Sequence, residues 1–157
     1  MKLVTILFLR KGDQILLALK KRGFGEGKWN GVGGKADPGE SATQAAIREC
    51  QEEIGVTPIN PTLVGKIKFY EKTDPSFGHY AHVFFATEWG GQPTETEEMR
   101  PEWFAIQDIP YDKMWVDDIL WLPLALDGKL LEATITFDNW QPLEHDIKIV
   151  SNLTEQP

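Results

Sequence analysis

The stretch from Gly34 to Val56, GKADPGESATQAAIRECQEEIGV, constrains this chain more than any other. It opens with an Asp-Pro-Gly turn, and Ser41 is followed three residues later by Gln44, a spacing typical of a capping box that begins a helix. Several alanines favour the helix that follows, and Gly55 can adopt the left-handed conformation that ends one. The stretch therefore predicts a single helix between a turn and a glycine.

The two sides of this predicted helix differ in chemistry. At about 100° per residue, the side that we expect to be buried carries Thr43, Ile47, Cys50 and Ile54. The other side carries three carboxylates, on Glu49, Glu52 and Glu53. Like charges at this spacing repel, and a divalent cation would turn that repulsion into binding. The alternative is an acidic face that is simply solvated.

The spacing of this stretch resembles the signature of the Nudix family, a loop-helix-loop that binds metal and diphosphate. The matching positions are Gly34, Glu40, Arg48, Glu49, Glu52, Glu53 and Gly55. One departure is Cys50, where an aliphatic residue is usual, although a buried free cysteine behaves as a small hydrophobe. The resemblance implies the α/β Nudix fold, in which a mixed β-sheet is sandwiched between α-helices.

The same resemblance implies a metal site that holds Mg²⁺, with Mn²⁺ as a possible substitute. The three glutamates of the helix are its ligands, together with the carbonyl oxygen of Gly33 and one glutamate outside the signature. Glu98 matches that outer position, whereas Glu95 and Glu97 fit less well. Carboxylate and carbonyl oxygens are the hard ligands that Mg²⁺ prefers.

Three residues of the signature are expected to serve catalysis. Glu53 or Glu52 would orient or deprotonate the attacking water, and the resemblance leaves this choice open. Arg48 would hold Glu52, one helical turn away, through an ion pair. Glu40 is expected to orient its neighbours rather than to bind metal.

The loop before the signature, KKRGFGEGKWNGVGGK, is glycine-rich and basic. On composition alone, the loop fits a flexible connector as well as it fits a wall of the site. KKRGFG, WNG, GGK, EMRP and MWVDD nevertheless follow the order found in the animal members of the family that hydrolyse oxidised purine nucleoside triphosphates, and the resemblance covers nearly the whole chain. It implies a substrate pocket formed by Thr5, Lys20, Phe24, Asn30, Gly33, Gly34, Lys35, Trp115, Asp117 and Asp118.

Within that pocket, Trp115 can stack on a purine while Phe24 closes the other side. Asp117 and Asp118 can share a proton and so accept purine edges of opposite hydrogen-bonding pattern. The amide of Asn30 both donates and accepts hydrogen bonds. By residue type alone, however, a tryptophan such as Trp115 is more often a core residue, and two neighbouring aspartates more often start a helix.

The rest of the chain predicts the sheet and one further helix. Runs of apolar or alternating residues predict strands over 3–9, 15–19, 63–71, 79–88, 131–137 and 147–149. A loop is expected at 89–93 and a short apolar element at 103–104. Asp117 is expected to cap a helix that runs to Leu126, with Pro123 inside it.

Charge and composition exclude several classes of function. A net charge of −8 and a pI near 4.9 argue against binding nucleic acid or an anionic membrane. A single cysteine excludes an intrachain disulfide, and no apolar run approaches the roughly 20 residues of a membrane span. We expect one domain over residues 1–157, with a flexible tail at 151–157, acting as a monomer in a reducing cytoplasm.

The resemblance implies a Mg²⁺-dependent diphosphatase that sanitises the nucleotide pool. Its substrates would be oxidised purine nucleoside triphosphates such as 8-oxo-dGTP and 2-oxo-dATP, and its products the monophosphate and pyrophosphate. The alternatives are a Nudix hydrolase of another nucleoside diphosphate derivative and a non-catalytic module that senses a nucleotide. The intact signature counts against the second alternative.

Overall fold

A mixed β-sheet organises the chain in the computed structural model, which describes residues 1–155 apart from the side chain of Leu143. The strands are β1 (Lys2–Lys11), β2 (Gln14–Lys20), β3 (Trp29–Asn30), β4 (Thr57–Pro58), β5 (Thr62–Glu71), β6 (Gly78–Ala86), β7 (Trp89–Gly90), β8 (Met99–Ala105), β9 (Leu130–Asp138) and β10 (Gln141–Val150). The main sheet has the order β10-β9-β5-β6-β1-β2-β3, and β8 also pairs with β2. The β1–β6 and β5–β9 pairs are parallel, and the other pairs of this sheet are antiparallel.

The strands that the sequence predicted are present. Most of their ends are displaced by one or two residues, but β10 begins at Gln141 rather than near residue 147, and the short element expected at 103–104 is part of the longer strand β8. The short strands β3, β4 and β7 are additional to the prediction. β3 pairs with β2 inside the glycine-rich loop before the signature, and β7 pairs with β4 where we expected a loop at 89–93. Two residues are too short to show an alternating pattern, so no sequence signal indicated these strands.

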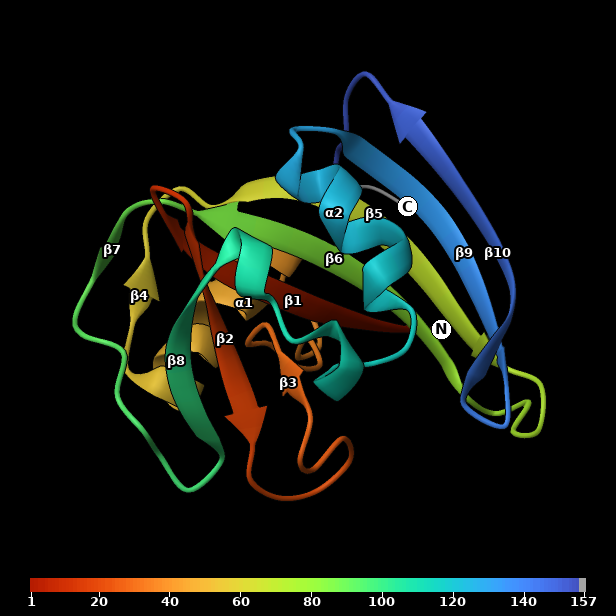
Figure 1. The fold of residues 1–157 in the computed structure, drawn as a ribbon, viewed down its shortest axis with the longest axis horizontal. Helices are drawn as coiled ribbons and strands as arrows, with labels where there is room; N and C mark the ends of the chain where they lie inside the picture. Colours follow the sequence, from red (N-terminus) through yellow and green to blue (C-terminus); the bar gives the residue numbers. More distant parts are fainter. Residues whose placement is uncertain (156–157) are drawn as a thin grey trace.

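Helices cover the two faces of the sheet, as predicted. They are α1 (Ala42–Ile54) and α2 (Asp118–Leu126), and the short 3₁₀ turns η1 (Ile106–Asp108) and η2 (Tyr111–Lys113) precede α2. Leu7 of β1 packs into the cluster that contains Cys50 of α1, whereas its neighbour Phe8 packs into the cluster that contains Trp121 of α2. Successive side chains of a strand point to opposite faces, so α1 and α2 lie on opposite faces; Figure 1 shows α2 in front of the sheet.

The predicted ends of α1 are confirmed. The side chain of Ser41 accepts from the backbone N–H of Gln44, whose own side chain accepts from the backbone N–H of Ser41, and Gly55 ends the helix at φ 73°. The predicted buried side is only partly correct, because Thr43 and Ile47 are half-buried. The buried residues of the helix are Ala42, Ala45, Ala46, Cys50, Glu53 and Ile54.

Helix α2 is also present, but Asp117 does not cap it with its side chain. Instead, Oδ2 of Asp117 accepts a hydrogen bond of 2.8 Å from the indole N–H of Trp121, one turn further on. Pro123 lies within the helix and does not end it. Within residues 1–155, no helix is long and apolar enough to cross a membrane.

The segment after β10 returns to the body of the fold. The carbonyl oxygen of Thr154 accepts from Nζ of Lys66 at 2.9 Å, and the Glu155 carboxylate accepts from the backbone N–H of Thr43 at 2.8 Å. Residues 156–157 of the expected flexible tail lie outside the described residues. The flexibility of 151–157 and the single-domain organisation of 1–157 stay predictions.

Candidate active site

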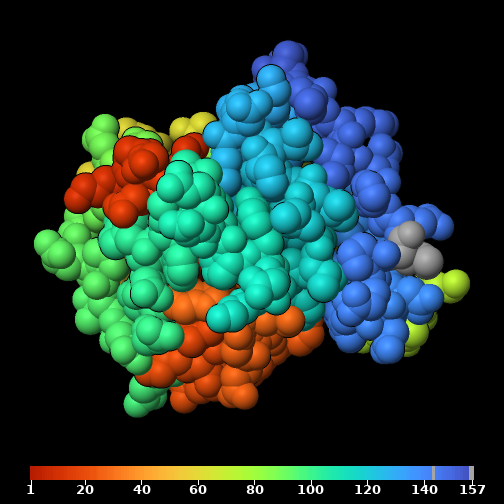
Figure 2. All heavy atoms as spheres, viewed as in Figure 1, coloured from red at the N-terminus to blue at the C-terminus, as the bar shows by residue number. Residues whose placement is uncertain are grey.

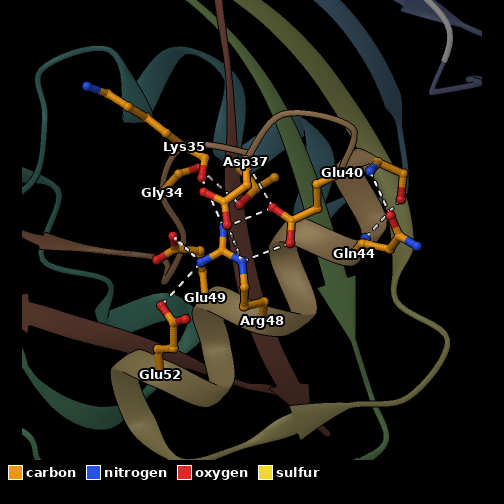
Figure 3. Close-up of polar contacts among 10 residues, drawn as sticks. Gly34, Lys35, Asp37, Glu40, Gln44, Arg48, Glu49 and Glu52 are labelled. Atoms are coloured by element: carbon orange, nitrogen blue, oxygen red, sulfur yellow. Dashed lines mark hydrogen bonds and ion pairs between the residues drawn. The ribbon is translucent and has the colours of Figure 1, made fainter.

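Arg48 is the centre of an ion-pair network on α1 (Figure 3). Its Nε and Nη2 atoms donate to the two carboxylate oxygens of Glu40 at 2.8 and 2.9 Å. Its Nη1 atom donates to Glu49 at 3.0 Å and to Glu52 at 3.2 Å. The hydrogen bonds from Arg48, followed by one from the backbone of Asp37, lower the pKa of Glu40 to about 2. The expected Arg48–Glu52 ion pair is therefore present, and the same guanidinium also holds Glu40 and Glu49.

Two glycines let the loop before α1 pass directly against these carboxylates. The backbone N–H of Gly33 donates to Oε1 of Glu53 at 2.8 Å. A Cβ atom on Gly33 would lie 1.8 Å from the carbonyl oxygen of Thr5, and one on Gly34 would lie 2.8 Å from the carboxylate carbon of Glu49. A side chain on Gly33 would collide with the backbone of β1, so this close approach requires glycine there, whereas a side chain on Gly34 would have to displace the end of the Glu49 side chain.

Glu53 is buried, which corrects the expectation that three carboxylates share an exposed face. It is 7% exposed, whereas Glu49 is half-buried and Glu52 is exposed. Burial raises the pKa of Glu53 to about 8, the hydrogen bond from Gly33 opposes that rise, and the charge of Glu49 adds to it. A carboxyl group in these surroundings is hard to ionise unless a cation compensates its charge.

The donor set suits a hard divalent cation, since Glu49, Glu52, Glu53 and Glu98 supply carboxylate oxygens. Among residues 1–155, however, no group of three or more His, Cys, Asp or Glu side chains is arranged to hold a metal ion. Glu49 and Glu52 bind Arg48 instead, and Glu53 binds the backbone of Gly33. The residue types fit the cation, and their side chains would have to turn toward it.

The glutamates between β7 and β8 meet two basic residues of the glycine-rich loop. Nζ of Lys21 donates to Glu95 at 2.6 Å, and Nε of Arg22 donates to Glu98 at 2.9 Å. The charge of Glu98 also contributes to the raised pKa of Glu53. Of these two glutamates, Glu98 is therefore the one placed to act on the carboxylates of α1.

A cavity of about 300 Å³ lies beside this network. Its lining includes all ten residues expected to bind substrate: Thr5, Lys20, Phe24, Asn30, Gly33, Gly34, Lys35, Trp115, Asp117 and Asp118. Their role in binding stays a prediction, but the fold brings them together. Lining residues to which the sequence assigned no role include Lys28, Phe69, Phe77, His79, Phe137 and Trp140.

Asp117 and Asp118 form a buried acidic pair in this lining, 2% and 3% exposed. Burial raises the pKa of Asp117 to about 6, although the hydrogen bond from Trp121 lowers it. Burial and then the charge of Asp117 raise the pKa of Asp118 well above its usual value, against the influence of Lys28. Oδ2 of Asp118 is buried with no hydrogen-bond partner among the described residues. Ionisation of both members of the pair is therefore opposed, most strongly at Asp118, where the charge of Asp117 adds to the effect of burial.

The two rings expected to sandwich a base contact each other instead. The ring centroids of Phe24 and Trp115 lie 5.0 Å apart, with an angle of 30° between the rings. A base between two rings would need them about 7 Å apart, twice the ordinary contact distance. Phe24 is 58% exposed, and it stands on a loop in which Gly23 and Gly25 have positive φ. Access to this face of Trp115 therefore requires Phe24 to move.

Comparison with known proteins agrees with this geometry. The family model of the NUDIX domain matches residues 2–125 of this chain. The oxidized purine nucleoside triphosphate hydrolase of Danio rerio is 43% identical over 154 residues, which are 98% of this chain and 95% of that protein. Its namesake from Mus musculus is 42% identical over 128 residues, which are 82% of this chain and 81% of that protein.

Among solved structures, a MutT protein from Bacillus halodurans has a TM-score of 0.81 to this chain. The two are 26% identical, and the match covers 94% of this chain and 98% of that one. Fold, signature and whole-length similarity thus agree with one another. The chain therefore belongs to the Nudix family.

Proposed function

We propose that this protein hydrolyses oxidised purine nucleoside triphosphates to the monophosphate and pyrophosphate, and so removes damaged precursors from the nucleotide pool. The observation that carries the proposal is the buried pair Asp117–Asp118 in the lining of a cavity that also reaches Gly33 and Gly34. One protonated and one ionised acid offer a donor and an acceptor to the edge of a purine. The names of the fish and mouse relatives support the same substrate class.

The rest of the cavity suits the phosphates and the base. Lys20, Lys28 and Lys35 line it and supply positive charge in a chain whose net charge is −8. Oδ1 of Asn30 accepts from the backbone N–H of Gly31 at 2.8 Å, which orients the amide group of Asn30 in the lining. Charge neutralisation and orientation are what phosphoryl-transfer chemistry asks of a protein.

Glu49, Glu52 and Glu53, with the carbonyl of Gly33 and with Glu98, would hold Mg²⁺, or Mn²⁺ in its place. Such a cation, when bound, lowers the pKa of a coordinated water and neutralises phosphate oxygens. Arg48 keeps Glu49 and Glu52 in position. Glu53 is our candidate for the group that orients the attacking water or takes its proton, because it is buried and the hydrogen bond from Gly33 holds its carboxylate in place. Glu52 is the alternative.

A product assay over a panel of nucleotides tests the proposal. The panel contains 8-oxo-dGTP, 2-oxo-dATP, the unmodified triphosphates and several nucleoside diphosphate derivatives, each incubated with Mg²⁺ and resolved by chromatography. We expect a nucleoside monophosphate and pyrophosphate, formed fastest from the oxidised purines. Faster hydrolysis of a diphosphate derivative would contradict the proposed substrate, and binding without hydrolysis would indicate a sensor. On the same proposal the protein acts as a monomer in the cytoplasm, with the nucleotide as its ligand.

A further inference from the structure

The turn between β9 and β10 has an uncommon composition. Asp138 pairs with Gln141, so the turn consists of Asn139 and Trp140 alone. Their φ angles are 53° and 64°, both in the left-handed region. Turns of this class usually carry Asn-Gly, because glycine adopts this conformation without steric penalty. A tryptophan in the position of that glycine is an outlier, and outliers of this kind gather at functional sites.

A buried carboxylate fastens this turn in place. Glu71, the last residue of β5, is 2% exposed and accepts from the backbone N–H groups of Asn139 and Trp140, each at 2.9 Å. It also accepts from the backbone N–H and the hydroxyl of Thr73, at 2.9 and 2.6 Å. Burial opposes its ionisation, but these hydrogen bonds outweigh burial and lower the pKa of Glu71 to about 2. The anchor is therefore charged at neutral pH, and it reaches from one strand to the turn of its neighbour.

The anchored turn holds the indole of Trp140 among the aromatic residues of the cavity. Its ring centroid lies 5.1 Å from that of Phe77, 5.4 Å from that of Phe24, and 5.9 Å from those of Trp115 and Phe137. Phe24 belongs to the glycine-rich loop, and Figure 2 shows that loop, in orange, approaching the blue hairpin on one face of the molecule. Trp140 thus touches rings from several separate segments.

Exposure tells which side of the cavity these rings occupy. Phe24 is exposed and Trp140 is half-buried, whereas Asp117 and Asp118 are buried. The acids therefore form the inner end of the cavity, and Phe24 and Trp140 lie on its solvent side. Because Phe24 and Trp115 contact each other, the indole of Trp140 offers a further planar surface on which a base can stack.

We propose that Trp140 is a substrate-binding residue that contacts the purine base from the solvent side of the cavity, and that Glu71 is the positioning residue that holds it there. This inference rests on the proposed function. Stacking on the indole would add affinity for any purine. Covering the base would also exclude water from the hydrogen bonds to the two aspartates, which strengthens them.

Trp140→Gly separates this role from simple packing. The substitution removes the ring, keeps the N–H that donates to Glu71, and installs the Asn-Gly pair that the turn prefers. We expect binding of 8-oxo-dGMP, measured by calorimetry without metal, to weaken about 10- to 100-fold, the usual range for loss of base stacking. KM for 8-oxo-dGTP should rise while kcat changes little, and the melting temperature should change by only a few degrees. Trp89→Ala, which removes a half-buried ring outside the cavity, is the matched control and should leave binding unchanged.

Glu71→Gln tests the positioning role. It should weaken nucleotide binding in the otherwise unchanged protein and add little to the loss caused by Trp140→Gly, because both changes act through the same ring. Additive losses would show that Glu71 does not act through Trp140. If Trp140→Gly does not fold, Trp140→Phe and Trp140→Leu replace it. Binding kept by Phe and lost by Leu supports the proposal, and equal binding by the two overturns it.

The outcomes also separate this inference from the proposed function. Unchanged protein that neither binds nor hydrolyses oxidised purine nucleotides overturns the proposed function, and this inference with it. If the unchanged protein and the Trp140→Gly variant bind these nucleotides equally well, this inference alone is overturned. A lower melting temperature of the variant with unchanged binding also overturns this inference alone, because it assigns Trp140 a purely structural role.

Discussion

Asp118→Asn tests how the buried acidic pair works, because it keeps the size of the side chain and removes its titratable proton. Asp118 is 3% exposed, and burial together with the charge of Asp117 raises its pKa well above the usual value. In the unfolded chain the same group titrates near its ordinary pKa of about 3.9. The folded protein therefore binds this proton more tightly than the unfolded chain does.

The sign and size of the effect on stability follow from that difference. The favourable contribution of the protonated Asp118 is fully present below about pH 4 and is lost as pH rises toward the folded pKa. Between those limits, one proton corresponds to a loss of about 1.4 kcal/mol of unfolding free energy per pH unit. The variant lacks this proton. From about pH 5 to pH 7, the unfolding free energy of the variant should therefore fall less steeply with pH than that of the unchanged protein. The two slopes should differ by up to about 1.4 kcal/mol per pH unit.

The same substitution should change substrate preference. Loss of one hydrogen bond to a charged group in a desolvated pocket costs about 1.5–3 kcal/mol, which is roughly 10- to 150-fold in kcat/KM. The loss should differ between 8-oxo-dGTP and 2-oxo-dATP, because their edges demand opposite proton patterns and the variant cannot exchange a proton with Asp117. Trp115→Ala should instead weaken both by a similar factor, since stacking does not depend on the edge of the base.

Two measurements decide this prediction. Urea denaturation at several pH values gives the slope of the unfolding free energy, and initial rates of pyrophosphate release with each triphosphate give kcat/KM. Identical slopes for the two proteins, together with equal losses on both substrates, would refute proton sharing by Asp117 and Asp118. Asp118 would then be no more than the first residue of α2.

Three further changes probe the metal site and the loop beside it. Glu53→Gln keeps the acceptor for the N–H of Gly33 but removes the charge, so turnover should fall by several orders of magnitude. The melting temperature in chelator should stay level or rise, because a like-charge repulsion is relieved. Near-normal turnover at saturating Mg²⁺ would remove Glu53 from the mechanism. Mg²⁺ or Mn²⁺ should raise the melting temperature, as any ligand of the native state does, and calorimetry should find no such rise in the double variant Glu49→Gln, Glu52→Gln. A persistent rise places the cation elsewhere. Gly33→Ala puts a Cβ atom 1.8 Å from the carbonyl oxygen of Thr5. The unfolding free energy, measured by urea denaturation, should therefore drop by at least about 2 kcal/mol. An unchanged value would mean that the loop can shift away from β1 at little cost.

Local sequence signals predicted α1 well because what sets its ends lies within or next to it, in the reciprocal pair Ser41–Gln44 and in Gly55. The same local argument failed for Glu53. Helical periodicity grouped it with exposed acids, but Gly33, twenty residues earlier in the chain, passes directly over it. Burial by a distant segment leaves no mark in the periodicity of a helix.

The cavity shows the same division. Resemblance to the family placed ten residues that the fold does bring together, whereas Phe77 and Trp140 were missed. These two belong to turns that follow different strands, and the order β9-β5-β6 in the sheet decides that the turns lie close together. Glu71 was missed for a related reason, because a glutamate at the end of a strand is usually solvated. Only its tertiary partners show that it is an anchor.

The central claim is that this Nudix protein selects oxidised purine nucleoside triphosphates, and the kcat/KM ratio of 8-oxo-dGTP to dGTP tests it most directly. The measurement follows pyrophosphate release at saturating Mg²⁺ and near pH 7, with the Glu53→Gln variant as the background. We predict a ratio above about 10, because dGTP lacks the N7–H and the C8 oxygen that can pair with the amide of Asn30, and leaving a polar group of the pocket unpaired costs about 1–3 kcal/mol. A ratio near 1 would contradict the claim, and so would release that persists unchanged in the Glu53→Gln variant.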